Sequence, residues 1–223
     1  MIKDTLVKLT GVVAVAFLML ATSVLAIAQA PAKTSYGLLL DSTGSMRSQF
    51  QTVLNIGKAI VHDAAPQGPV SIFNFASEGI GKGSKAVPVL RIQQSQDEAR
   101  LNRTIDELYI QGGQTTLLDA IQFISDRLQE WAADSEKVIV VVSDGEDRVS
   151  NVKSKDLIQQ LKDRKIKVVA VGLVRELDSG KRGKATKLLT AISSETGGRA
   201  VFPEGVVNVQ AALKELAIRP RNR

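Results

Sequence analysis

Short apolar runs alternate with amphipathic segments along most of this chain, and this alternation restricts its fold more than any other feature. The runs predict strands at 36–40, 70–75, 87–92, 138–142, 166–171 and 199–202. The intervening apolar periodicity predicts helices at 46–61, 97–108, 117–131, 156–164, 184–195 and 209–218. Strands and helices that alternate in this way require right-handed crossovers. The expected fold is therefore a three-layer, doubly wound α/β domain with a mostly parallel sheet and helices on both faces.

We expect six strands in the spatial order 3-2-1-4-5-6. The run at 138–142 is continuously β-branched, which is typical of a central strand covered on both faces. Pro88 cannot donate a ladder hydrogen bond, so the third strand should be an antiparallel edge strand. Ligands bind such sheets beyond the carboxyl ends of the strands, where the strand order reverses. Asp41 ends the first strand there, and Ser143 and Asp144 end the fourth.

Composition excludes several kinds of site. The 223 residues include no cysteine and a single histidine, so thiolate chemistry and a multi-histidine zinc site are ruled out. The formal net charge is +6, but the excess is spread along the chain, and there are only one Trp, two Tyr and six Phe. A nucleic-acid surface needs a clustered basic face with stacking aromatics, so we expect no nucleic-acid partner.

The N-terminus resembles an export signal. Lys3 and Lys8 precede an uncharged run over 9–28, which ends in the small-x-small triplet that begins at Ala26. We interpret 1–28 as a signal peptide, with an uncleaved membrane anchor as the alternative, because about 20 apolar residues can span a bilayer. In either case the remainder is expected to be exported, as a periplasmic or secreted protein.

Hard oxygen ligands are concentrated at the predicted sheet crevice. The segment that follows the first strand has Asp41, Thr43 and Ser45 at alternate positions, Thr115 stands in a later glycine-rich loop, and Asp144 follows the fourth strand. Carboxylate and hydroxyl oxygens suit Mg²⁺, Mn²⁺ or Ca²⁺. Two carboxylates and a few neutral hydroxyls leave a coordination place vacant on a divalent ion, so such a site should accept an anionic ligand from outside.

These residues resemble the von Willebrand factor A (VWA) family and its metal-ion-dependent adhesion site (MIDAS), whose pattern is Asp-x-Ser-x-Ser, a later Thr and a later Asp. Asp41, Thr43, Ser45, Thr115 and Asp144 match it in order, except that Thr43 replaces the usual Ser. The resemblance implies a VWA-like domain over 33–218, followed by a basic tail at 219–223. It also implies a divalent cation, most simply Mg²⁺, and a partner protein whose Asp or Glu completes the coordination.

The resulting hypothesis is an exported, non-enzymatic module for cation-dependent protein–protein binding. One alternative is a Mg²⁺-dependent phosphoesterase with Asp41 as nucleophile, although Thr43 stands where aspartyl-phosphate enzymes place a second Asp. Another is an envelope assembly or scaffold protein in which the metal site is not essential.

Simpler roles remain open for the same residues. Asp41 and Ser45 could cap one helix, Thr115 or Thr116 could cap the next, and Asp144 with the following glycine could form a plain turn. Asp119 is expected to favour the dipole of its helix. Glu146 and Asp147 are expected to be solvated loop charges, and 175–187 is expected to be a loop, either one that flanks the partner surface or an ordinary solvated loop.

Overall fold

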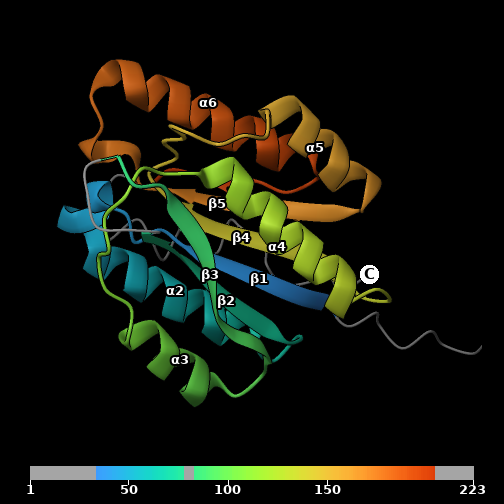
Figure 1. The fold of residues 1–223 in the computed structure, drawn as a ribbon. Helices are drawn as coiled ribbons and strands as arrows, with labels where there is room; N and C mark the ends of the chain where they lie inside the picture. The colour runs from blue at the N-terminus through green and yellow to red at the C-terminus, as the bar shows by residue number, and fades with distance from the viewer. Residues whose placement is uncertain (1–33, 78–82, 204–223) are drawn as a thin grey trace, which may run out of the picture. The chain divides into compact units, whose positions relative to one another are not determined.

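Six strands form one sheet in the order β3-β2-β1-β4-β5-β6 in the computed structural model, which describes residues 34–77 and 83–203 (Figure 1). All neighbouring strands are parallel except β2 and β3, which are antiparallel. The predicted strand order and the antiparallel edge strand are therefore confirmed. The strands are β1 (Thr34–Leu40), β2 (Val70–Ser77), β3 (Ala86–Ser95), β4 (Glu136–Ser143), β5 (Ile166–Gly172) and β6 (Ala200–Val201).

Helices cover both faces of the sheet, as predicted. Figure 1 shows α2 and α3 on one face and α4, α5 and α6 on the other. The helices are α2 (Phe50–Ala64), α3 (Glu98–Asp106), α4 (Leu117–Trp131), α5 (Ser154–Asp163) and α6 (Ser179–Glu195), with 3₁₀ turns η1 (Gly44–Gln49) and η2 (Val174–Glu176). The predicted helix at 46–61 is thus divided, because its first turn is the 3₁₀ turn η1.

The core has two halves because successive side chains of a strand point to opposite faces. Leu38 and Leu40 of β1 pack with α2 and α3, whereas Leu39 packs with α4, α5 and α6. All seven residues of β1 are buried, and only Glu136 of β4 is exposed. These two central strands are therefore rigid supports for whatever follows their carboxyl ends.

The prediction that 175–187 is a loop is wrong, because this segment is mostly helical. The 3₁₀ turn η2 is followed by α6, which begins at Ser179, where the Asp178 carboxylate accepts a hydrogen bond from the Lys181 N–H (3.0 Å). The first turns of α6 contain Gly180 and Gly183 and lack an apolar stripe. Periodicity therefore indicated only the later part of the helix.

Three predicted segments lie outside the described residues: the signal peptide at 1–28, the closing helix at 209–218 and the basic tail at 219–223. Within 34–77 and 83–203, no helix is long and apolar enough to cross a membrane.

Candidate metal centre

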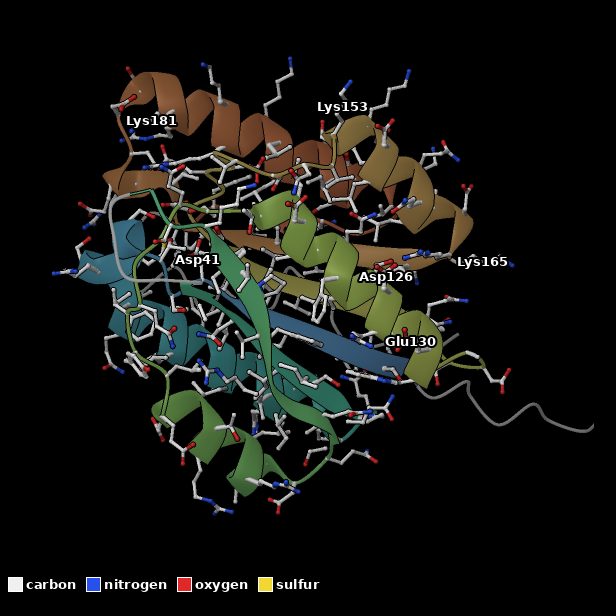
Figure 2. The ribbon with its side chains drawn as sticks, viewed as in Figure 1. Asp41, Asp126, Glu130, Lys153, Lys165 and Lys181 are labelled. Carbon is white, nitrogen blue, oxygen red and sulfur yellow. The ribbon has the colours of Figure 1, made fainter. Side chains whose placement is uncertain are left out.

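The carboxyl ends of β1 and β4 bring two acidic residues together from distant parts of the sequence. Leu40 is paired with Val142, and the next amide, that of Asp41, donates to the carbonyl oxygen of Val142 (2.9 Å). Asp41 therefore begins the loop that leaves β1, beside the strand that leads to Asp144 (Figure 2). This position is the switch point at which the strand order reverses.

Asp41 is fully buried and accepts three hydrogen bonds. Its Oδ1 accepts from the Thr43 backbone N–H (3.0 Å) and from the Thr43 hydroxyl (2.7 Å). Its Oδ2 accepts from the Ser143 hydroxyl (2.6 Å), which in turn accepts from the Gly145 N–H (3.0 Å). Both carboxylate oxygens are thereby held in fixed directions.

The hydroxyls of the first loop extend from Asp41 toward the surface. The Thr43 and Ser45 hydroxyl oxygens are 3.2 Å apart, Thr43 is only 1% exposed, and Ser45 is exposed. Solvent and other molecules therefore reach this cluster from the Ser45 side.

Asp144 has one satisfied and one unsatisfied carboxylate oxygen. Its Oδ1 accepts from the Glu146 N–H (2.9 Å). Its Oδ2 is buried and has no hydrogen-bond partner among the described residues. Buried polar atoms are nearly always paired, so this oxygen marks a place where a ligand is expected.

Both carboxyl groups have raised pKa values. The pKa of Asp41 is raised from 3.8 to about 6, first by burial and then by the Asp144 charge, against the opposing effect of the Ser143 and Thr43 hydrogen bonds. Burial also raises the pKa of Asp144, whereas the nearby Ser45 hydroxyl and the Glu146 N–H lower it. Two buried carboxylates that repel one another favour either a proton or a cation between them.

The glycine-rich loop that contains Thr115 adjoins the first loop. The Gln111 N–H donates to the Ser42 carbonyl oxygen (3.0 Å), and the Thr115 carbonyl oxygen accepts from the Arg148 N–H (3.0 Å). Thr115 is 2% exposed. The hydroxyl of the neighbouring Thr116 donates to a backbone carbonyl of β3, which makes Thr115 the better candidate ligand of the two.

The donor set fits a hard divalent cation. Two carboxylates and the hydroxyls of Thr43, Ser45 and Thr115 would hold the ion, and the unpaired Oδ2 of Asp144 would gain a partner. No cluster of three or more His, Cys, Asp or Glu occurs in the described ranges 34–77 and 83–203. Hydroxyl oxygens therefore make up a large share of the candidate ligands. Such a ligand set suits Mg²⁺ or Mn²⁺ better than a soft metal that prefers thiolates.

Capping accounts for only part of what these residues do, since Asp41 accepts from the Thr43 N–H just before η1 but also accepts from two hydroxyls. Neither Thr43 before η1 nor Thr116 before α4 makes a side-chain capping hydrogen bond. The predicted turn at Asp144 is present, because Gly145 has a φ of +76° and the Asp144 carboxylate accepts from the Glu146 N–H. The turn uses only one carboxylate oxygen, and so it leaves Oδ2 for another role.

The prediction of a solvated charge is wrong for Glu146, and Asp147 is partly buried. Glu146 is only 9% exposed and forms ion pairs with Arg148 and Lys181 (3.3 Å to the latter). The Asp147 carboxylate accepts from the Leu118 N–H (3.3 Å) and the Ser150 hydroxyl (2.5 Å). Their sequence context, a polar stretch after a strand, does not reveal these partners because they come from α4, α6 and the same loop.

Sequence reasoning missed three supporting residues. Ser143 orients Asp41, as described above. Ser42 is fully buried, its hydroxyl donates to the Phe75 carbonyl oxygen, and it accepts from the Asn74 side-chain amide (2.8 Å). Asn74 in turn accepts from the Arg91 guanidinium (2.6 Å). The available signal was a polar residue in a largely apolar strand, at the end of β4 for Ser143 and inside β2 for Asn74.

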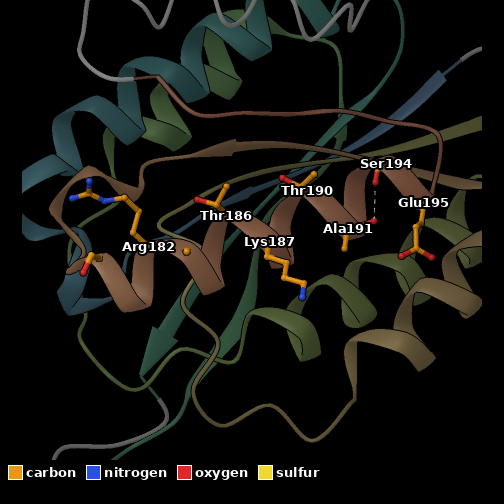
Figure 3. A pocket seen from close by; sticks show the side chains of 9 residues that line it. Arg182, Thr186, Lys187, Thr190, Ala191, Ser194 and Glu195 are labelled. Carbon is orange, nitrogen blue, oxygen red and sulfur yellow. Dashed lines mark hydrogen bonds between the residues drawn. The ribbon is translucent and has the colours of Figure 1, made fainter.

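A pocket elsewhere on the surface does not include these loops. It is lined by the outward face of α6, including Arg182, Lys187 and Glu195 (Figure 3). The residues that line it all belong to one helix, and none of the five candidate metal ligands contributes to it.

Comparison with known families gives one match over most of the chain. The model of the von Willebrand factor type A domain matches residues 37–215. No curated protein matches this sequence.

Solved structures share the fold at low sequence identity. Proximal thread matrix protein 1 from the mussel byssus, with a zinc-occupied MIDAS motif, has a TM-score of 0.63 and 16% identity and covers 84% of this chain. The pilus adhesin SpaC from Lactobacillus rhamnosus GG, in an open conformation, has a TM-score of 0.62 and 14% identity over 85% of this chain. Manganese-loaded TRAP protein from Plasmodium vivax has a TM-score of 0.60 and 15% identity over 84%.

The present chain is shorter than these proteins. The match spans 46% of the mussel protein, 30% of SpaC and 72% of TRAP. At these identities the likeness concerns the fold alone.

Proposed function

Because the chain belongs to the von Willebrand factor type A domain family, whose members are protein–protein interaction modules that often depend on a metal ion, we propose that it binds a partner protein through a divalent cation. Asp41, Thr43, Ser45, Thr115 and Asp144 hold the cation, and a carboxylate of the partner completes its coordination.

The unpaired, buried Oδ2 of Asp144 is the observation that carries this proposal. An unsatisfied buried oxygen costs about 1–3 kcal/mol, and more when it is charged. The nearby negative charge of Asp41 increases that cost, because the two carboxylates repel one another. Both groups therefore have a stronger tendency to bind a positive ligand. A divalent cation would satisfy Asp144 Oδ2 and relieve the repulsion at the same time.

The charge and exposure of the cluster support an acidic partner. Two carboxylates and three neutral hydroxyls supply five ligands, which leaves a place in the octahedral shell of Mg²⁺ for one more hard oxygen. The exposed Ser45 lies on the solvent side of the cluster, whereas Asp41 and Thr43 are buried. An incoming Asp or Glu would therefore reach the ion from the Ser45 side.

Mg²⁺ is the ion that we propose, because oxygen-only ligands and a small buried site suit it. The zinc and manganese in two related structures support a divalent cation in general. Manganese is a useful probe because it takes the same hard ligands.

We propose that the domain is a binding module without catalytic activity. Both oxygens of Asp41 are held by hydrogen bonds from Thr43 and Ser143, and the side chain is fully buried. A nucleophilic carboxylate needs an exposed oxygen that is aimed at the substrate, so the phosphoesterase alternative has no support in this arrangement.

We also propose that the protein acts outside the cytoplasm, on the basis of its N-terminal sequence. The mass of the mature protein purified from its native source tests this. A chain that begins after Ala28 indicates cleavage and export, whereas an intact N-terminus in a cytoplasmic fraction contradicts the proposal.

Calorimetric titration with Mg²⁺ and Mn²⁺ tests the binding function directly. Wild-type protein is expected to bind one ion, and Asp41→Ala and Asp144→Ala are expected to bind none while they keep a cooperative unfolding transition. Asp126→Ala is the matched control, because Asp126 is a surface carboxylate on α4 that pairs with Arg164. Partner capture from an envelope extract should then require Mg²⁺ and be lost in EDTA; capture that is equal in EDTA contradicts the proposal.

A further inference from the structure

Two of the three loops that carry the candidate metal ligands are joined to each other by hydrogen bonds. The first turn of α4 follows Thr115, and the β4–α5 loop (residues 144–153) follows Asp144. The Thr115 carbonyl oxygen accepts from the amides of Arg148 (3.0 Å) and Val149 (3.4 Å). These backbone contacts hold the two loops side by side but do not involve the segment around Asn151.

Asp119 joins that segment to α4 with its whole carboxylate. Its Oδ1 accepts from the amides of Asn151 (2.9 Å) and Val152 (3.0 Å). Its Oδ2 accepts from the Asn151 amide (3.0 Å) and from the Asn151 side-chain amide (3.0 Å). Hydrogen bonds to an ionised acceptor are roughly twice as strong as neutral ones.

A second set of contacts lies beside the first. The Asp119 amide donates to the Ser150 hydroxyl (3.2 Å), and that hydroxyl donates to Asp147 (2.5 Å). The Asp147 carboxylate also accepts from the Leu118 amide (3.3 Å). The amides of Leu118 and Asp119 at the start of α4 are therefore satisfied by the β4–α5 loop and not by a capping side chain of Thr116.

We propose that Asp119 is a positioning residue for the metal centre, which fixes the Asp144 loop against the Thr115 loop. This inference rests on the proposed function, since it concerns the same cation. Between Asp144 and Ser154 the chain has no regular secondary structure, so side-chain contacts must supply its order. Each residue that is ordered costs about 1–2 kcal/mol of conformational free energy. The hydrogen bonds of Asp119 offset that cost in the metal-free protein, so the loop is already ordered when the ion binds.

A purely local role for Asp119 makes a different prediction. An acidic residue in the first turn of a helix stabilises the helix dipole wherever its carboxylate points. That effect lowers the melting temperature when it is removed but leaves the dissociation constant of a distant ion unchanged. The positioning role requires the dissociation constant itself to change.

The test compares two aspartates of the same helix. Asp119→Ala removes the contacts to the β4–α5 loop, whereas Asp126→Ala removes a carboxylate two turns further along α4, away from Asp41 (Figure 2). Dissociation constants for Mn²⁺ are measured by calorimetry at a temperature well below the melting point of every metal-free variant. We expect Asp119→Ala to bind Mn²⁺ about 10-fold or more weakly, as supporting residues around metal ligands commonly do. We expect Asp126→Ala to stay within twofold of wild type.

Hydrogen exchange gives a second readout. In the wild type, adding Mg²⁺ instead of Mn²⁺ should slow hydrogen exchange at the Asn151 and Val152 amides, because coupling between the ion and the loop is reciprocal. That protection should be absent in Asp119→Ala and present in Asp126→Ala. If Asp119→Ala does not fold, Asp119→Asn replaces it, since Asn keeps one acceptor oxygen, and a several-fold weakening is expected.

The outcomes separate the two proposals. Failure of the wild type to bind Mn²⁺ overturns the proposed function. Tight Mn²⁺ binding by the wild type together with binding by Asp119→Ala within twofold of it overturns the positioning role alone.

Discussion

Asp41 is held where an ionised carboxylate is costly. It is fully buried beside Asp144, and only neutral groups donate to it: the Thr43 hydroxyl and N–H and the Ser143 hydroxyl. A residue that lowers the stability of its own fold in this way is typical of a binding site. In the metal-free protein its charge is a source of instability, and in the metal-bound protein it is a source of affinity.

Asp41→Asn should therefore stabilise the metal-free protein. The Asn carbonyl oxygen can accept from Thr43, and its NH₂ can donate to the Ser143 hydroxyl oxygen, so the shape persists without the charge and the Ser143 contact reverses its direction. A pKa raised from 3.8 to about 6 sets an upper limit of about 3 kcal/mol, and we expect a gain of about 1–3 kcal/mol at pH 7. Urea unfolding in EDTA measures it; a large loss of stability would contradict this account of Asp41.

The gain from Asp41→Asn should also depend on pH. Below about pH 4 Asp41 is protonated in both the folded and the unfolded state, so the two proteins should differ little. Between about pH 4 and pH 6 the unfolded chain releases the proton while the folded wild type retains it, so the wild-type free energy of unfolding falls as pH rises. Above that window the difference should be constant. Urea titrations of both metal-free proteins from pH 4 to pH 8 measure this, and a difference that does not vary with pH would refute it.

Individual residues differ in how far the sequence could predict them. The five candidate ligands could be named because their residue types and order form a pattern. Structure brings Asp41, Thr43, Ser45 and Asp144 into one cluster, although whether they bind a metal remains a prediction. Ser143 and Asn74 were missed because a hydroxyl or amide in a strand has many uses, and only the contact with Asp41 or Ser42 reveals this one.

At the scale of elements, close packing at a glycine links the Asp144 loop to α6. Gly145 has a φ of +76°, and a Cβ there would lie 2.8 Å from Leu189 Cδ1 and 3.2 Å from Ala185 Cβ. Helix α6 therefore rests directly on the backbone of the loop that follows Asp144. Movement of either one requires the other to adjust.

Gly145→Ala and Gly197→Ala form a matched pair that tests this packing. Both glycines have similar left-handed φ angles, +76° and +81°, but nothing lies within 4 Å of a Cβ at Gly197. Each substitution should cost about 1–2 kcal/mol for the backbone. Gly145→Ala should cost about 1–3 kcal/mol more because of overpacking against Leu189. Urea unfolding measures both, and equal losses would show that the packing is not tight.

The elements themselves were predictable where apolar periodicity decides their position. Helix α4 was predicted at its observed bounds, because its buried residues recur at spacings of three and four. Helix α6 was predicted too short, because glycines and polar residues occupy its first turns and Asp178 sets its start. A helix start that depends on one capping residue leaves no periodic signal.

For the whole domain, the crossovers between strands decide which loops meet. The order β3-β2-β1-β4-β5-β6 makes β1 and β4 neighbours, although about 100 residues separate Asp41 from Asp144. This order could be expected from alternating strands and helices together with the edge position of Pro88. The contacts of Glu146 with Lys181 could not, because they depend on where α6 lies over the sheet.

Because the proposed ion joins loops from different parts of the fold, its binding should stabilise the whole domain and not one segment. At an ion concentration 100 times the dissociation constant, binding adds about 2.7 kcal/mol to the free energy of unfolding. For a domain of this size that corresponds to a rise in melting temperature of roughly 5–10 °C. The rise should reverse in EDTA, should be absent in Asp41→Asn and should be retained in Asp126→Ala. Calorimetric melting with and without Mg²⁺ measures it. Identical wild-type melting curves in millimolar Mg²⁺ and in EDTA would mean that the Asp41 and Asp144 loops are held together without an ion.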